Sequence, residues 1–173
     1  MIGITGHTSG IGKAVFARLG SDACGFSTSN GHDITSAQDR KKIIKSVRHC
    51  RVFINNASDG FGQTELLIEL FQEWHEQSKL ILNVGSRIAE LTHTKGNLHL
   101  LPYLSQKKSL KFTVAEIQNY PCRVEYVWFG FVGTARILSK YPHFTENDFI
   151  SVDAAADIIM KPVLDYLDHD QGI

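Results

Sequence analysis

Residues 5–13 read TGHTSGIGK, and they lie between a short apolar run and an amphipathic segment. Three glycines in such a connection let the backbone turn tightly and pass close to a ligand, because glycine has no side chain to interfere. The amide groups that begin the following helix, with the positive end of its dipole, favour a bound anion such as a pyrophosphate. We therefore predict a strand, a phosphate-binding loop and a helix over residues 1–19.

This loop does not match the P-loop of nucleoside-triphosphate enzymes. His7 stands where that motif requires its first glycine, and Ala14 stands where it requires Ser or Thr. The spacing instead assigns Gly6 to a tight turn, Gly10 to close approach of a ligand and Gly12 to close packing of helix on sheet, as in dinucleotide-binding loops.

The rest of the chain alternates between short apolar runs and amphipathic segments, which is typical of parallel strands joined by crossover helices. Because the apolar runs show no alternation, helices should cover both faces of the sheet. We expect one α/β domain over residues 1–173, a doubly wound Rossmann-like fold with a five-stranded parallel sheet in the order 2-1-3-4-5. The strands are predicted at residues 1–5, 23–27, 51–55, 79–84 and 123–129, and the helices at residues 10–19, 36–49, 64–77, 102–119 and 151–167.

Composition limits the kinds of molecule that the protein is expected to bind. The formal net charge of the 173 residues is +0, so the overall charge favours neither nucleic acid nor an anionic membrane surface. No apolar stretch approaches the length of about 20 residues that a membrane span needs, and no signal peptide is visible. We expect a cytoplasmic protein with a small-molecule substrate.

The cysteines and histidines predict neither a disulfide framework nor a metal site. Cys24, Cys50 and Cys122 are odd in number, far apart in sequence and without a C-x-x-C pair, which favours reduced thiols with packing roles. The pair His75-Glu76 is followed by Lys79 where a zinc-binding H-E-x-x-H motif needs its second histidine.

The glycine loop resembles that of the short-chain dehydrogenase/reductase family, and the family's other motifs follow in order. Asn55, Asn56 and Ala57 resemble the Asn-Asn-Ala-Gly motif, with Ser58 in place of its last glycine. Ser86 occupies the place of the family's catalytic serine, at the end of the fourth predicted strand.

Two further motifs lie in the second half of the chain. Tyr103 and Lys107 match the Tyr-x-x-x-Lys signature at the start of a predicted helix, and their i, i+4 spacing puts both on one helical face. Gly130 and Thr134 match the Gly-x-x-x-Thr motif, with Phe129 in place of the expected proline.

The resemblance implies an NAD(P)(H)-dependent oxidoreductase that transfers a hydride between nicotinamide and a small carbonyl or secondary alcohol. In this interpretation Tyr103 is the general acid/base, Lys107 assists its deprotonation and binds the nicotinamide ribose, and Ser86 orients the substrate oxygen. The residues implied to contact the cofactor are Gly6, Thr8, Ser9, Gly10, Ile11, Gly12, Ser27, Thr28, Asp33, Ile34, Asn55, Asn56, Ala57, Lys107, Gly130 and Thr134.

The chain also departs from the family pattern, since one strand and one helix before Asp33 are missing. The predicted helix between Ala57 and Ser86 contains no asparagine to match the family's catalytic asparagine, and Gln72 or a water is the expected substitute. Residues 27–30 offer hydroxyls and no carboxylate, which favours NADP(H) over NAD(H).

The segment 135–150, expected to be a short substrate loop, carries Tyr141, Phe144 and Phe149, which favour a local hydrophobic plug over a specificity pocket. A homodimer is implied through the helix that bears Tyr103. Two alternatives stay open: a regulatory protein that binds NADP(H) without turnover, and a reductase or epimerase of nucleotide sugars, for which the C-terminal part is small.

Overall fold

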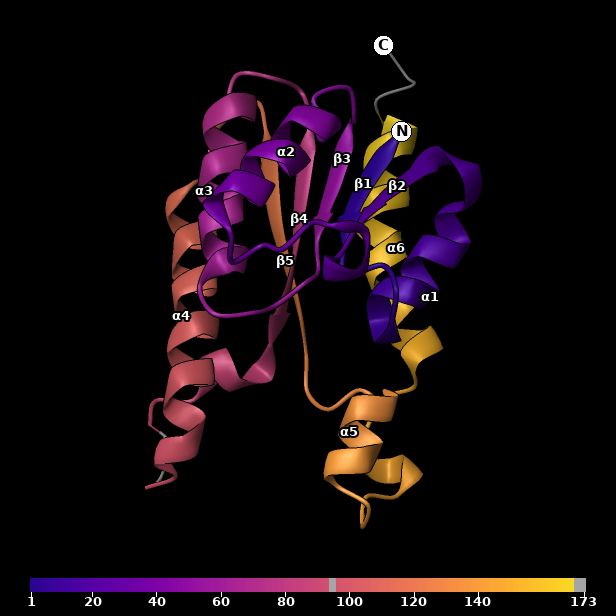
Figure 1. The fold of residues 1–173 in the computed structure, drawn as a ribbon, viewed down its shortest axis with the longest axis vertical. Helices are drawn as coiled ribbons and strands as arrows, with labels where there is room; N and C mark the ends of the chain where they lie inside the picture. The colour runs from indigo at the N-terminus through magenta and orange to yellow at the C-terminus, as the bar shows by residue number, and fades with distance from the viewer. Residues whose placement is uncertain (94–95, 170–173) are drawn as a thin grey trace.

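A computed structural model describes residues 1–93 and 96–169, and within them the chain forms one parallel sheet with helices on both faces (Figure 1). The sheet order is β2-β1-β3-β4-β5, and each neighbouring pair is parallel. The predicted fold class and strand order are therefore confirmed. The strands are β1 (Ile2–Thr5), β2 (Ala23–Phe26), β3 (Val52–Asn55), β4 (Leu80–Ser86) and β5 (Arg123–Phe129).

The helices form two layers. One face of the sheet is covered by α1 (Gly10–Leu19) and α6 (Val152–His169), and the other by α2 (Ala37–Val47), α3 (Gly62–Trp74) and α4 (Leu101–Glu116). A short helix, α5 (Ala135–Lys140), lies beyond the sheet in the segment expected to be a loop. The 3₁₀ turns are η1 (Gly20–Asp22), η2 (Thr28–Asn30), η3 (Arg87–Glu90), η4 (Leu98–Leu100) and η5 (Glu146–Asp148).

The α1/α6 layer packs on the sheet mainly through apolar side chains. Burial of such side chains stabilises the fold by about 25 cal/mol per Å² of apolar surface removed from water. At the surface, Arg18 joins the two helices by ion pairs to Asp153 at 2.9 Å and Asp157 at 3.0 Å. The sheet residues buried in this layer are Ile2, Ile4, Val52, Ile54, Leu80, Leu82, Val84 and Phe129.

On the opposite face, a buried arginine connects α2 to α3. Arg40 is 5% exposed, forms ion pairs with Glu65 and Glu69 at 2.8 Å, and donates a hydrogen bond to the Ile34 carbonyl at 2.9 Å. A Cβ on Gly62 would lie 2.4 Å from that same carbonyl oxygen. The first turn of α3 is therefore packed directly onto residue 34.

Several element ends differ from the predicted ones for local reasons. β4 continues to Ser86, since this residue pairs with Phe129 of β5. α4 ends at Glu116, three residues early, and Asn119 takes a left-handed φ of 68°. Ser36 caps the start of α2, because its hydroxyl accepts from the Asp39 amide. No helix in the described ranges is long and apolar enough to cross a membrane.

Candidate active site at the carboxyl edge of the sheet

At each glycine of the loop between β1 and α1, a side chain is disfavoured for a different steric reason. Gly6 and Gly10 have φ values of +71° and +50°, which side chains rarely tolerate. A Cβ on Gly12 would lie 2.1 Å from the Gly6 carbonyl oxygen, and a Cβ on Gly10 would lie 3.1 Å from Cγ2 of Thr134. The tight turn and the close helix packing expected from the sequence are both present.

The start of α1 is open to an anion. Ser9 is the N-cap residue, yet its side chain makes no capping hydrogen bond, and the first turn carries no acidic residue. Thr8 and Ser9 are exposed, and Ile11 is half-buried. His7 turns away from this opening, because its ring packs 4.9 Å from that of Phe16 and covers Gly25 of β2.

The Asn-Asn-Ala segment holds this loop in place. The amides of Asn56 and Ala57 donate to the Thr5 hydroxyl at 3.0 and 2.9 Å, and the Asn56 side chain donates to the Thr5 carbonyl at 3.0 Å. Thr5, which sequence reasoning left out of the site, is thus the anchor between β1 and β3. Its position just before Gly6, at the end of a buried strand, was the available signal.

The end of β2 offers less free hydrogen-bonding capacity than its sequence indicates. The Ser27 hydroxyl is paired with that of Ser29 at 2.8 Å, and the Asp33 carboxylate accepts from both the amide and the hydroxyl of Thr35. Ile34 is 5% exposed and belongs to the core. Thr28, which is exposed, is the hydroxyl on this edge that faces solvent.

Four polar side chains form a buried network between the sheet, α3 and α4. Lys107 donates to the Gln63 side-chain oxygen at 2.7 Å, and Gln63 donates to the carbonyls of Asn55 at 2.7 Å and Val84 at 2.9 Å. Asn55 donates in turn to the Gln63 carbonyl at 2.8 Å and to the Asn83 side chain at 3.0 Å. We call Asn55, Gln63, Asn83 and Lys107 the Gln63 network.

The residue expected to replace the family's asparagine was assigned wrongly. Gln72 is exposed and lines a hollow of about 550 Å³ between α2 and α3, away from Lys107. Gln63 bonds to Lys107 instead, because α3 begins two residues earlier than predicted and presents its first turn to α4. A polar residue just after the third strand, near the sheet edge where ligands bind, was the signal that sequence reasoning missed.

Lys107 is buried without a counter-ion. Its side chain is 3% exposed, and no ion pair to it is found within residues 1–93 and 96–169. Burial lowers the pKa of Lys107 to about 8, because desolvation disfavours the ammonium form. Its Nζ lies 5.7 Å from the ring centre of Tyr103, which is 42% exposed at the rim. Tyr103 and Lys107 are therefore adjacent. The Lys107 side chain is buried, and the Tyr103 side chain is partly exposed at the surface.

Ser86 ends β4 close to this pair. Its hydroxyl accepts from the Ile88 amide at 3.3 Å, and the turn η3 that follows packs on α4. Tyr126 of β5 lies over Gly85, where a Cβ would meet the phenol at 2.1 Å, and its hydroxyl is buried next to the Ser86 backbone. The pKa of Tyr126 is raised, chiefly by burial and further by Glu90 and Tyr103, so this second phenol is near the first.

The segment after β5 returns to the glycine loop. Thr134 caps α5 by accepting from the Ile137 amide, and its methyl group covers Gly10. Gly130 is exposed, and a Cβ there would lie 3.9 Å from Cδ of Arg87, the residue after Ser86. The Gly-x-x-x-Thr segment thus spans from the Ser86 region to the start of α1.

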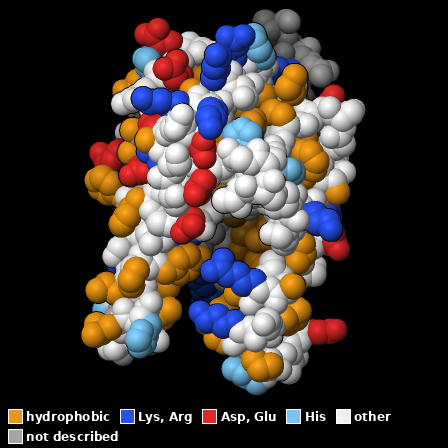
Figure 2. Space-filling view, in the orientation of Figure 1, with side chains coloured by type: hydrophobic (Ala, Val, Ile, Leu, Met, Phe, Trp, Pro, Cys, Tyr) orange, Lys and Arg blue, Asp and Glu red, His pale blue; other side chains and the backbone are white. Residues whose placement is uncertain are grey.

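The amino-terminal end of α4 and the α5 segment project beyond the sheet, and Figure 2 shows a hollow between them with apolar and basic side chains along it. On the α5 side, Tyr141 stacks on Phe144 at 4.8 Å, and Phe131 packs against both rings. Phe149 covers Gly133. Phe131, Tyr141 and Phe144 thus form a local aromatic cluster.

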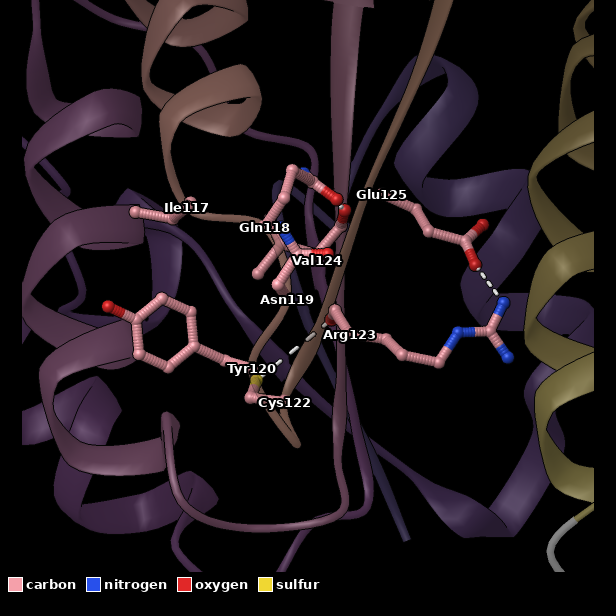
Figure 3. A pocket seen from close by; sticks show the side chains of 8 residues that line it. All are labelled: Ile117, Gln118, Asn119, Tyr120, Cys122, Arg123, Val124 and Glu125. Atoms are coloured by element: carbon pink, nitrogen blue, oxygen red, sulfur yellow. Dashed lines mark hydrogen bonds and ion pairs between the residues drawn. The ribbon is translucent and has the colours of Figure 1, made fainter.

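Another hollow lies at the opposite edge of the sheet. It measures about 190 Å³ and is formed by residues 117–120 and 122–125, at the amino end of β5 (Figure 3). It therefore takes no part in the carboxyl-edge site. Across the described part of the chain, no group of three or more His, Cys, Asp or Glu side chains could hold a metal ion.

Comparison with known proteins identifies the fold. A short-chain dehydrogenase from Burkholderia cenocepacia J2315 in complex with NADP has a TM-score of 0.69 and 16% identity, over 94% of this chain and 83% of that one. A serine dehydrogenase complexed with NADP⁺ gives 0.67 and 14%, over 92% and 88%, and a Burkholderia phymatum enzyme in complex with NAD gives 0.68 and 12%, over 95% and 86%. No protein-family profile and no curated protein matches the sequence. The chain has the short-chain dehydrogenase/reductase fold in a compact form.

Proposed function

We propose that the protein is an NAD(P)(H)-dependent oxidoreductase that interconverts a small carbonyl compound and its secondary alcohol. The observation that carries the proposal is the buried, unpaired Lys107 beside Tyr103, held by Gln63 at the same sheet edge as the glycine loop. An unpaired buried lysine costs stability, so a structure that retains one argues for a functional use.

The residues present fit a dinucleotide. The uncapped start of α1 and the bare Gly10 would receive the pyrophosphate, Thr28 would face the adenosine ribose, and Gly130 and Thr134 would border the nicotinamide. When bound, the nicotinamide would supply the hydride acceptor or donor. Because residues 27–30 carry no carboxylate, we favour NADP(H) over NAD(H).

The protein's own side chains would manage the proton. Tyr103 would exchange a proton with the substrate oxygen, since its hydroxyl is at the exposed rim where a substrate can reach it. The Lys107 ammonium would stabilise the phenolate, and Gln63 would fix the position of that ammonium by accepting its proton in a hydrogen bond. Ser86 would orient the substrate oxygen from the end of β4.

The first test is cofactor binding. We expect NADPH to bind the wild type more tightly than NADH in calorimetric titrations, and Gly10→Asp to abolish binding, because it adds strain and negative charge at the pyrophosphate position. Gly20→Asp is the matched control, since Gly20 has a similar φ of +60° with nothing within 4 Å. If wild type binds neither nucleotide, or if both variants bind equally well, the proposal is wrong.

The second test separates catalysis from binding. Tyr103→Phe should bind cofactor normally and lose oxidation of NADPH over a panel of carbonyl compounds, since no proton donor remains. Tyr120→Phe, at a tyrosine of similar exposure near the other end of α4, should keep full activity. Cofactor binding by wild type with no turnover of any carbonyl would favour the regulatory NADP(H)-binding protein instead.

A homodimer formed on α3 and α4 remains part of the proposal. Ile68 and Phe112, on these two helices, are 41% and 66% exposed and would be covered in such a dimer. Light scattering of the wild type and of a Phe112→Glu variant tests it: we expect a dimer from the first and a monomer from the second.

A further inference from the structure

Two of the three cysteines, distant in sequence, lie together at the amino edge of the sheet. Cys24 of β2 and Cys50, just before β3, have their sulfur atoms 3.7 Å apart. β1 runs between these two strands, and its Gly3 pairs with Cys24 on one side and Phe53 on the other. A Cβ on Gly3 would already lie 2.8 Å from Val47 and 2.9 Å from Phe53. The two thiols therefore meet although they come from the strands on either side of β1.

The two sulfurs have different surroundings. Cys50 is fully buried, at 0% exposure, whereas Cys24 is partly exposed. The hydrogen bond from Cys50 lowers the pKa of Cys24 to about 7, although partial burial opposes the shift. The pKa of Cys50 is raised, since it keeps the proton that it donates and is desolvated. The thiolate, which is the reactive form of cysteine, thus resides on the more accessible sulfur.

We propose that Cys24 and Cys50 form a hydroperoxide-reactive thiol pair that closes to an intramolecular disulfide. The structural basis is the 3.7 Å contact between the two sulfurs, one on a partly exposed residue and the other on a fully buried one. Closing the bond requires the sulfurs to approach from 3.7 Å to about 2.0 Å, with the movement of β2 against β3 that this entails.

The chemistry balances with hydrogen peroxide as oxidant. The Cys24 thiolate attacks one peroxide oxygen, the O–O bond breaks, and hydroxide leaves to become water with the proton that Cys24 had released. This step gives a sulfenic acid on Cys24. The Cys50 sulfur then attacks the Cys24 sulfur, the S–O bond breaks, and the hydroxyl group leaves as a second water with the Cys50 proton. The two thiols lose two electrons, and one peroxide becomes two waters.

Cys122 is an internal control for this reactivity. It is 2% exposed, its pKa is raised to about 11 by burial, and its nearest polar partner is the Arg123 carbonyl at 3.9 Å. Figure 3 shows its sulfur directed at that carbonyl, with no second sulfur among the drawn side chains. The same treatment should therefore leave Cys122 reduced.

The disulfide would join β2 to β3 at the edge opposite the glycine loop. In the unfolded chain the disulfide would link residues 24 and 50 and so lower the conformational entropy of that state. It should therefore raise the melting temperature. Cofactor affinity should change less than twofold, since Gly6 to Gly12 lie at the other end of β1. The proposal is independent of the oxidoreductase activity, and its test uses neither cofactor nor substrate.

The experiment treats the folded protein with hydrogen peroxide near pH 7.5, alkylates the remaining thiols and maps peptides under non-reducing conditions. We expect a Cys24–Cys50 disulfide, one alkylated thiol at Cys122, and the same disulfide in Cys122→Ser. Cys50→Ala removes the hydrogen bond that lowers the Cys24 pKa, so we expect Cys24 to oxidise more slowly in this variant and its sulfenic acid to be captured by a dione probe after longer treatment. Circular dichroism checks that each variant is folded, and Cys24→Ser gives a second variant that must form no disulfide.

Other outcomes overturn the proposal. Equal oxidation of all three cysteines would show that the pair has no special reactivity. A sulfinic acid on Cys24 in the wild type, with Cys50 still alkylated, would show that Cys50 does not resolve the intermediate. Absence of any oxidation while a small free thiol in the same solution is consumed would show that neither sulfur is accessible enough to react.

Discussion

The two faces of the sheet bury different kinds of side chain near the carboxyl ends of the strands. On the α1/α6 face, the inward positions are apolar up to the carboxyl edge, ending with Val84. On the α2–α4 face, the last inward positions are polar: Thr5, Asn55 and Asn83, followed by Tyr126 in register on β5. The α1/α6 face therefore buries mainly apolar side chains. The α2–α4 face buries polar side chains at the carboxyl edge, where we propose that the cofactor binds.

The largest effect should come from the apolar face. Leu82→Ala removes a fully buried side chain of β4, and it should lower the free energy of unfolding by about 2–5 kcal/mol. Cofactor affinity of the folded protein should stay the same, because Leu82 faces away from the Gln63 network. Denaturant titration and calorimetry measure the two quantities. Ile158→Ala, at an exposed position on α6, is the control and should cost much less.

Lys107→Met should reveal how much the buried Lys107 ammonium lowers the free energy of unfolding. With a pKa of about 8 when folded and 10.5 when unfolded, Lys107 binds less proton in the folded state at intermediate pH, so its contribution becomes less destabilising as pH rises. From pH 7 to pH 10 the wild type should gain about 2–3 kcal/mol relative to the variant. Urea titrations at several pH values measure this difference, and parallel curves for both proteins would contradict it.

Gln63→Glu should test whether the network positions Lys107. A carboxylate beside Nζ raises the Lys107 pKa, which should move the alkaline limb of the pH–rate profile upward. The carbonyls of Asn55 and Val84 lose their donor, at a cost of about 1–3 kcal/mol in stability. Gln72→Glu makes the same chemical change at an exposed position of the same helix. An unchanged pH profile in Gln63→Glu would assign this residue a structural role alone.

The smallest effect should come from Thr134→Val. It removes the hydroxyl that caps α5 and keeps the methyl group over Gly10. The free energy of unfolding should therefore fall by about 1 kcal/mol or less. The change should be confined to the α5 segment, which hydrogen exchange can resolve. A loss of protection in α1 would instead show that Thr134 supports the glycine loop.

The fold could be predicted because its signals are local. The glycine loop, the apolar strand runs and the Ser36 cap each occupy a few consecutive residues, and the strand order followed from connection lengths. Gln63 could not be found by the same means, since its contact with Lys107 depends on where α3 starts and on how two helices pack. The contact between Cys24 and Cys50 could not be found for a comparable reason, since it follows from the order of β2, β1 and β3 in the sheet. The helix α5 was missed, because its six residues are too few for a periodic pattern.

Arg40 has a consequence for how such a chain could change over evolutionary time. It ties the start of α3 to residue 34 through Glu65, Glu69 and the Ile34 carbonyl, while Gly62 rests on the same carbonyl. The position of Gln63 is thus set from α2 rather than by the connection over residues 56–61. Insertions or deletions within residues 58–61 should therefore be tolerated without breaking the contact between Gln63 and Lys107.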